Sequence, residues 1–139
     1  MNLGDRIRRI ARQRGADERG WFLKVIDGKE EFLPRGTGEF YVTMAIPGRQ
    51  RGGHYHSICN EWFTVIQGFA EVILDDPATG ERMMTCLSEE FPETLYVPAG
   101  VAHIFSNPEG STTPFLLVAY ADRAYDPEDT ILYDFTVRP

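Results

Sequence analysis

The sequence predicts an all-β protein built as a double-sheet jelly roll or a small barrel. From about Trp21 onward, short apolar runs alternate with turn residues, and no run with helical periodicity extends beyond about three turns. Roughly eight such runs follow one another at spacings of about 8–12 residues, which is typical of folds that protect their strand edges by closing. Gly and Pro separate the runs, as they do in loop-rich β domains.

The expected strands span residues 21–26, 39–46, 62–67, 69–75, 81–87, 94–97, 102–106 and 114–121. The turn sequences PGRQRGG, DDPATGE and NPEGSTTP connect them. Gly68 joins two strands with almost no loop, so we expect a positive φ there, which glycine adopts without steric cost. The segment from Ala124 to Pro139 contains a Tyr-Asp-Pro turn and is expected to fold back over the barrel or to reach a partner subunit.

Length and charge predict one domain preceded by a distinct basic segment. A chain of 139 residues can bury a core as a single domain, and we expect a basic segment over 1–19 and one domain over 20–139. Residues 1–19 carry a balance of +3 and the remainder carries −10, within a net charge of −7. The acidic total argues against a nucleic-acid partner, because phosphate binding needs clustered cations. Leu3, Ile7 and Ile10 fall on one helical face, and we expect a short surface helix or frayed terminus rather than a membrane contact.

The chain is expected to be cytoplasmic and to have no membrane partner. No stretch approaches the roughly 20 apolar residues of a membrane span, and the first residues lack the apolar region of a secretory signal. Cys59 and Cys86 are the two cysteines, and they fit a compartment where thiols stay reduced. Both are expected to be small buried apolar residues.

All three histidines and one glutamate form a single spaced pattern. His54 and His56 are separated by one residue, so on a β-strand both imidazoles face the same side. Glu61 follows where a short turn could return its carboxylate to the same cavity, and His103 begins another expected strand. Three imidazoles and a carboxylate suit one divalent transition metal, either Zn, Fe, Mn, Ni or Co, and leave open positions for substrate or water.

The same spacing resembles the two signature motifs of the cupin superfamily. The first motif, G-x5-H-x-H-x4-E-x6-G, is met at every fixed position, by Gly48, His54, His56, Glu61 and Gly68. The second, G-x5-P-x-G-x2-H-x3-N, is met by Pro98, Gly100, His103 and Asn107, with Pro92 in place of its first glycine. The resemblance implies a cupin barrel over roughly residues 20–121, with His54, His56, Glu61 and His103 as the metal ligands.

Further segments resemble cupins that act on sugar nucleotides. The D-x-R-G-x-F sequence at 17–22 and the R-G-x-H-x-H sequence at 51–56 are similar to those of deoxyhexulose-type epimerases. The run at 125–135 is similar to the ending of thymidine-diphosphate-sugar 3,4-ketoisomerases. The N-E-x-F sequence at 60–63 and the Asp-Pro and Asp-Thr pairs of the tail are similar to the zinc cupin domain of capsular-sugar epimerase/reductases. Together they imply an isomerase or epimerase acting on a nucleotide-linked 4-keto-6-deoxy sugar.

The implied reaction is enolisation, in which a base removes the hydrogen next to a ketone and the site stabilises the oxyanion that develops. A bound metal would serve as the Lewis acid, leaving proton transfer to Tyr41, Tyr55, Tyr96 or Glu71. The expected substrate-binding residues are Arg49 and Arg51 for diphosphate or sugar oxygens and Phe105 for an apolar wall. Metal-free ketoisomerases of this group use the paired histidines as acid and base, but they look to have glutamine where Glu61 stands, so Glu61 favours a metal-assisted mechanism.

Two other functions stay open beside the isomerase or epimerase. A mononuclear Fe(II)-type oxygenase of a small molecule could use the same four ligands, with oxygen in an open position. A binding protein without catalysis could use the metal to anchor a small ligand. Metal identity and oxygen consumption would separate these classes. By analogy with cupins of this size, we expect a homodimer.

Overall fold

The structure is a computed structural model that describes residues 2–136. Nearly all of its regular structure is β, as predicted. The elements are α1 (Leu3–Arg6), β1 (Gly15–Asp17), β2 (Gly20–Ile26), β3 (Glu39–Ala45), β4 (Gln50–Tyr55), β5 (Glu61–Gln67), β6 (Phe69–Asp75), β7 (Arg82–Ser88), β8 (Thr94–Val97), β9 (Ala102–Ser106), β10 (Phe115–Ala121), the 3-10 turn η1 (Pro127–Asp129) and β11 (Ile131–Leu132). Each expected strand is present within one residue at either end. Strands β1, β4 and β11 were not expected as strands.

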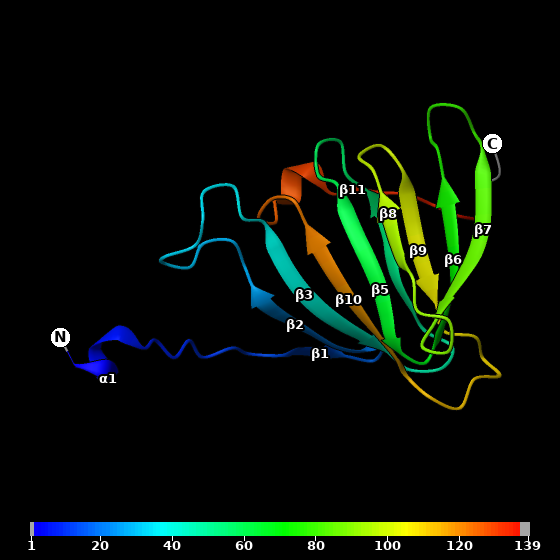
Figure 1. Cartoon of the computed structure of the whole chain (residues 1–139). Coiled ribbons are helices and arrows are strands. Elements are labelled where there is room, and N and C mark those ends of the chain that lie inside the picture. Colours follow the sequence, from blue (N-terminus) through cyan, green and yellow to red (C-terminus); the bar gives the residue numbers. More distant parts are fainter. Residues whose placement is uncertain (1, 137–139) are drawn as a thin grey trace.

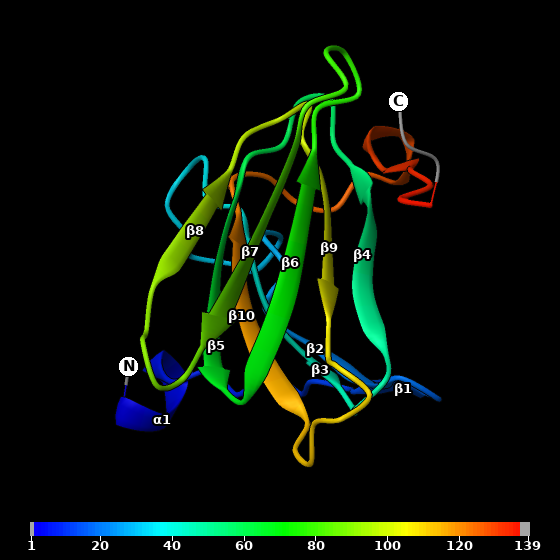
Figure 2. The ribbon, with the colours of Figure 1, turned by 90° about the vertical axis from the view of Figure 1, so that its right-hand side faces the viewer.

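The strands form two antiparallel sheets that face each other as a jelly roll (Figures 1 and 2). One sheet has the order β1-β2-β3-β10-β5-β8, and the other has the order β11-β4-β9-β6-β7. Neighbours in each sheet come from distant parts of the chain, so the barrel closes through long-range pairing. This closure confirms the predicted fold class.

The core lies between the sheets and follows the period-2 alternation of each strand. On β10, Phe115, Leu117, Ala119 and Ala121 face inward and are buried, whereas the residues between them are partly exposed. The same alternation buries Glu61, Phe63 and Val65 on β5. The inner face of β5 therefore begins with a carboxylate and continues with apolar side chains.

Two glycines allow close approach of strands, Gly52 beside the site and Gly68 at the far end of β5 from Glu61. Gly68 has a φ of 82°, as expected, and a Cβ there would lie 2.7 Å from the carbonyl oxygen of Pro114. Gly52 has a φ of 94°, and a Cβ would lie 2.6 Å from the carbonyl oxygen of His103. The register with β9 shifts between Gly52 and His54, which is a β-bulge, and His54 then pairs with His103. The bulge therefore places two of the three histidines side by side.

The two ends of the chain differ in how they are held. Residues 2–18 are exposed, and the short helix α1 and the segment after it extend away from the barrel in Figure 1, as expected for a surface segment. The C-terminal segment folds back over the barrel, as expected, and β11 pairs with β4. Residues 137–139 of this segment lie outside the described residues. Within the described residues, no helix is long and apolar enough to cross a membrane.

The two cysteines do not share one environment. Cys59 is buried, as expected, but Cys86 on β7 is exposed. The expectation for Cys86 was wrong because Leu87, the next residue, faces the core, so the alternation turns Cys86 outward.

Candidate metal centre

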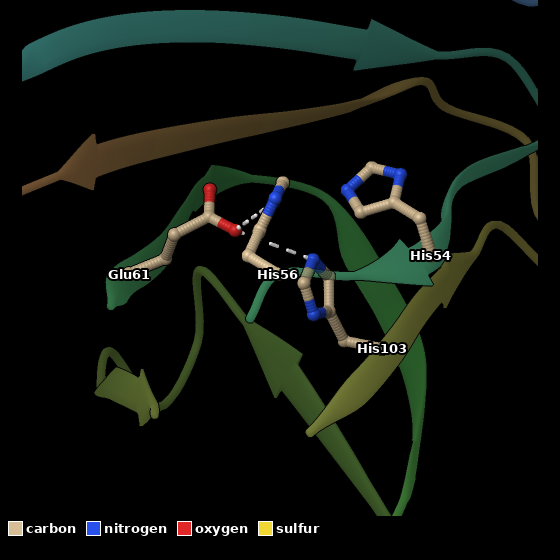
Figure 3. A group of neighbouring side chains, drawn as sticks. All are labelled: His54, His56, Glu61 and His103. Atoms are coloured by element: carbon tan, nitrogen blue, oxygen red, sulfur yellow. Dashed lines mark ion pairs between the residues drawn. The ribbon is translucent and has the colours of Figure 1, made fainter. Parts of the chain in front are cut away.

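The four side chains of the sequence pattern converge inside one end of the barrel. His54 lies on β4, His56 just after it, Glu61 at the start of β5 and His103 on β9. One ligand atom from each lies within 4.8 Å of the others, and Figure 3 shows the side chains turned toward one another. Glu61 and His103 are almost fully buried. A β-bulge, a loop and two separate sheets are needed to bring them together.

Backbone carbonyls fix the ring orientation of two of the histidines. His56 Nδ1 lies 2.9 Å from the carbonyl oxygen of Asp129, and His103 Nδ1 lies 3.2 Å from that of Val101. A carbonyl oxygen only accepts, so Nδ1 carries the hydrogen in both rings. Each Nε2 lone pair is therefore directed at the cluster, where Glu61 Oε1 lies 2.8 Å from His56 and 3.5 Å from His103.

Glu61 Oε1 is a buried oxygen without a hydrogen-bond donor among the described residues. The other carboxylate oxygen accepts a 2.8 Å hydrogen bond from the Tyr41 hydroxyl. A lone pair of His56 facing a carboxylate oxygen at 2.8 Å is repulsive unless a proton or a cation lies between them. The donor set of three imidazoles and one carboxylate fits a divalent transition metal in that position.

The electrostatics of the cluster shift the pKa values of its four side chains and so set their protonation states. Burial and the neighbouring histidines lower the pKa of His54 to about 4, and burial lowers the pKa of His103. Burial opposes charge on His56 and Glu61, but their mutual contact outweighs it, so the pKa of His56 is raised and that of Glu61 is lowered. His54 and His103 are therefore neutral near pH 7, which metal coordination requires.

Two cavities reach the cluster, and Phe22, Tyr41 and His54 line both. The first, of about 150 Å³, is walled by the C-terminal segment through Arg123, Ala124, Tyr125, Asp126, Asp129 and Thr130. The second, of about 200 Å³, is lined by Arg19, Arg51 and the apolar side chains of Phe63, Phe105 and Leu117. A small molecule in either cavity would touch the ligand cluster.

The other predicted site residues are scattered. Tyr41 is buried beside Glu61, and both burial and that carboxylate raise its pKa, so its hydroxyl stays protonated. Arg51 and Phe105 line the second cavity, although Arg51 already donates to the carbonyl oxygens of Trp21 and Met44. Neither cavity is lined by Arg49, Tyr55, Tyr96 or Glu71.

Three of those four residues have surroundings that explain their absence from the cavities. Tyr96 lies on the outer face and stacks on Trp62, with ring centroids 5.0 Å apart. Glu71 is exposed because Ala70 and Val72 on either side face the core. The ring of Tyr55 packs against Tyr133.

Sequence reasoning missed the residues of the C-terminal segment that wall the first cavity. Asp129 is the most buried polar residue among them. The signals were the expected fold-back of the tail and the resemblances of the run at 125–135, which do not reveal the strand against which the tail packs.

Solved structures share this fold. The chain superposes on the capsular polysaccharide assembling protein CapF from Staphylococcus aureus with a TM-score of 0.78 and 23% identity, covering 89% of this chain and 34% of that one. The epimerase RmlC from Legionella pneumophila gives a TM-score of 0.63 and 22% identity over 89% and 70%. A variant of Bacillus subtilis oxalate decarboxylase gives 0.69 and 20% over 87% and 30%. The fold is therefore a cupin jelly roll, and its barrel holds a candidate metal centre.

The chain belongs to the family described as the polysaccharide biosynthesis C-terminal domain, whose model matches residues 15–133. One relative is the UDP-2-acetamido-2,6-beta-L-arabino-hexul-4-ose reductase of Pseudomonas aeruginosa, 29% identical over 122 residues. The alignment covers 88% of this chain but 31% of the reductase, so this chain spans about a third of that relative. Another is the spore coat polysaccharide biosynthesis protein SpsL of Bacillus subtilis, 26% identical over 81% of this chain and 76% of SpsL.

Proposed function

We propose that this chain is a metal-binding cupin enzyme, an isomerase or epimerase that enolises a nucleotide-linked 4-keto-6-deoxy sugar. The observation that carries the proposal is the convergence of His54, His56, Glu61 and His103, whose ligand atoms lie within 4.8 Å of one another beside two cavities. The proposed cofactor is one divalent ion of Zn, Fe, Mn, Ni or Co.

The names of the relatives support the substrate class. The Pseudomonas relative is named for a UDP-linked hexul-4-ose, and the RmlC structure is a complex with dTDP-4-keto-L-rhamnose. Further structural neighbours include a 3'-monoepimerase from Streptomyces bikiniensis in complex with dTDP and a 4-keto-6-deoxy sugar epimerase, NovW. Two of these names include a keto sugar linked to a nucleoside diphosphate, one includes dTDP and one includes a 4-keto-6-deoxy sugar, and we assign the nucleotide-linked keto sugars to this chain.

We assign the residues around the cluster separate roles in metal binding, proton transfer and substrate binding. A bound metal would supply Lewis-acid stabilisation of the ketone oxygen. Tyr41 would hold and move a proton at its hydroxyl, which lies 2.8 Å from Glu61 and lines both cavities. Arg51, together with Arg19 at the mouth of the second cavity, would bind the diphosphate, and Phe105 would wall the same cavity.

Two measurements on purified protein test this function. We expect elemental analysis to find about one transition metal ion per chain. In D₂O we expect NMR to show deuterium entering the carbon next to the ketone of thymidine- or uridine-diphosphate 4-keto-6-deoxy sugars. The Glu61→Gln variant, which removes one ligand, should lose both properties. Metal without exchange, combined with oxygen uptake on other substrates, would move the assignment to an oxygenase.

We further propose that the protein is a cytoplasmic homodimer with the domain division of 1–19 and 20–139. The outer face of the six-stranded sheet supports the dimer, because its outward positions carry no charge. On β2, β3, β10, β5 and β8 these positions include Leu23, Ile26, Phe40, Val42, Met44, Trp62, Thr64, Ile66, Thr94, Tyr96, Leu116, Val118 and Tyr120. An uncharged sheet face of this extent supports an interface, and in the proposed dimer two copies pack it face to face.

Sedimentation at several protein concentrations tests the dimer. We expect the wild type to sediment as a dimer and the Val118→Lys variant, with a charge at the centre of the face, to sediment as a monomer. The matched control is Met84→Lys on the outer face of the other sheet, where Met84 is 69% exposed. A monomeric wild type at micromolar concentration would refute the dimer.

A further inference from the structure

Asp129 of the 3-10 turn η1 is a buried carboxylate held against the loop between two candidate ligands. It is 6% exposed. Its Oδ1 accepts the backbone N–H groups of Ser57 at 2.8 Å and Ile58 at 3.1 Å, and its Oδ2 accepts that of Cys59 at 3.1 Å. Three consecutive amides directed at one carboxylate form charge-assisted hydrogen bonds, which are stronger than neutral ones.

The position of that loop matters because residues 57–60 are the whole connection between His56 and Glu61. Any shift of the loop changes the separation of His56 Nε2 and Glu61 Oε1, which is 2.8 Å. A metal site tolerates only about 0.2 Å of error in its ligand distances. The hydrogen bonds from residues 57–59 to Asp129 therefore help to set the distance between His56 and Glu61.

The same residue also holds the imidazole of His56. Its backbone carbonyl oxygen lies 2.9 Å from His56 Nδ1. This contact fixes the tautomer in which Nε2 is free to face the cluster. Because the side chain of Asp129 is tied to residues 57–59, its carbonyl is held in register with the ring of His56. One residue of the C-terminal segment thus fixes both a ligand and the loop that follows it.

We propose that Asp129 is a positioning residue for the candidate metal centre, acting through the loop 57–59 and the ring of His56. This inference rests on the metal site of the proposed function. It also assigns a role to the C-terminal segment, because folding this segment back over the barrel completes the centre. In the wild type, the segment and the metal should therefore stabilise each other.

The first test reads the tautomer of His56 in metal-free protein. Long-range ¹H–¹⁵N NMR spectra should show wild-type His56 with its hydrogen on Nδ1 when the ring is neutral. In Asp129→Ala, and to a smaller extent in Asp129→Asn, both tautomers should be populated. The asparagine retains one acceptor oxygen but turns an N–H donor toward Cys59. The control is Asp134→Asn, which alters a tail carboxylate whose hydrogen bonds within residues 2–136 come from Thr136.

The second test measures the affinity for Zn²⁺ or Co²⁺ by calorimetry. We expect about 10–100-fold weaker binding in Asp129→Ala, an intermediate loss in Asp129→Asn and no loss in Asp134→Asn. Lower thermal stability in the Asp129 variants, with unchanged tautomer and unchanged metal affinity, would reduce Asp129 to a structural residue and overturn the proposal. Failure of the wild type itself to bind metal would instead refute the proposed function, and this inference with it.

Discussion

The two ends of the barrel interior are built by the same strands yet differ in chemistry. On β5, Glu61 faces the cavities, and the next inward residues, Phe63 and Val65, are apolar. On β9, His103 is followed at the next inward position by Phe105. The rings of Phe63 and Phe105 lie 4.6 Å apart, and the ring of His103 packs against Phe63 at 5.2 Å. The apolar layer is therefore the floor of the candidate metal centre.

This contrast separates the sources of stability and of chemistry within one barrel. The apolar end holds residues with almost no exposure, such as Val65 and Phe115, whereas cavities, an orphaned carboxylate oxygen and shifted pKa values gather at the other end. Burial of apolar surface stabilises the fold. Burying the ionisable groups of the polar end carries a desolvation cost in the metal-free protein. Substitutions at the apolar end should therefore change mainly the free energy of unfolding, and substitutions at the polar end should change mainly metal binding.

The largest effect on stability is expected from Phe63→Ala at the boundary between the two ends. Removing a ring that is 2% exposed leaves a cavity between Phe105 and His103. The free energy of unfolding should fall by about 3–5 kcal/mol, as measured by urea denaturation. In the control Met84→Ala, which removes an exposed side chain, the change should stay within about 0.5 kcal/mol. A loss of under about 1 kcal/mol in Phe63→Ala would mean that this layer is not the main support of the fold.

Metal binding should act on the polar end alone and produce the next largest effect. At a free Zn²⁺ concentration of about 100 times the dissociation constant, the free energy of unfolding should rise by about 2.7 kcal/mol, because only the folded state assembles the site. Thermal unfolding with and without a chelator measures the gain. His103→Ala should show none of it. An equal gain in that variant would place the ion elsewhere.

A smaller loss is expected where the C-terminal segment is fastened to β6. The hydroxyl of Tyr133 donates to Asp75 Oδ2 at 3.0 Å, and the Arg82 guanidinium pairs with the same carboxylate. Tyr133→Phe removes one hydrogen bond at the polar end, so the free energy of unfolding should fall by about 1 kcal/mol. Metal affinity should remain unchanged, since this bond does not touch His56. A change in affinity would mean that the segment moves as a unit.

The smallest effect on stability is expected from Glu61→Gln in metal-free protein. The amide can donate to Nε2 of neutral His56, so one hydrogen bond replaces the contact between His56 and the carboxylate. The free energy of unfolding should change by less than about 1 kcal/mol, although metal binding is lost. Chemical denaturation and metal titration of the same sample check the small change in stability and the loss of metal binding. A large loss of stability would show that the carboxylate serves the fold rather than the site.

Most of the fold could be predicted because the alternation on strands such as β5 and β10 is regular and the turns between them contain glycine or proline. The strand β4 was missed because Gly52 and Gly53, read as part of a turn, form a bulge inside the strand. The strands β1 and β11 are short and lie at sheet edges, where no apolar alternation marks them.

For the candidate centre, the spacing of the three histidines and Glu61 was sufficient to predict the convergence of their side chains. The roles of Tyr55, Tyr96 and Glu71 were guessed from residue type, and side-chain direction depends on register, which a sequence shows only weakly. Asp129 could not be found because its partners lie about 70 residues earlier in the chain. A long-range contact of this kind is visible only after the tail has been placed.

The difference between the two cysteines allows selective chemical labelling. Burial raises the pKa of the Cys59 thiol to about 12, whereas Cys86 lies exposed on β7. A maleimide reagent should therefore attach at one position without any engineering of the chain. A fluorophore or spin label introduced there would report from the edge of the five-stranded sheet, clear of the cavities.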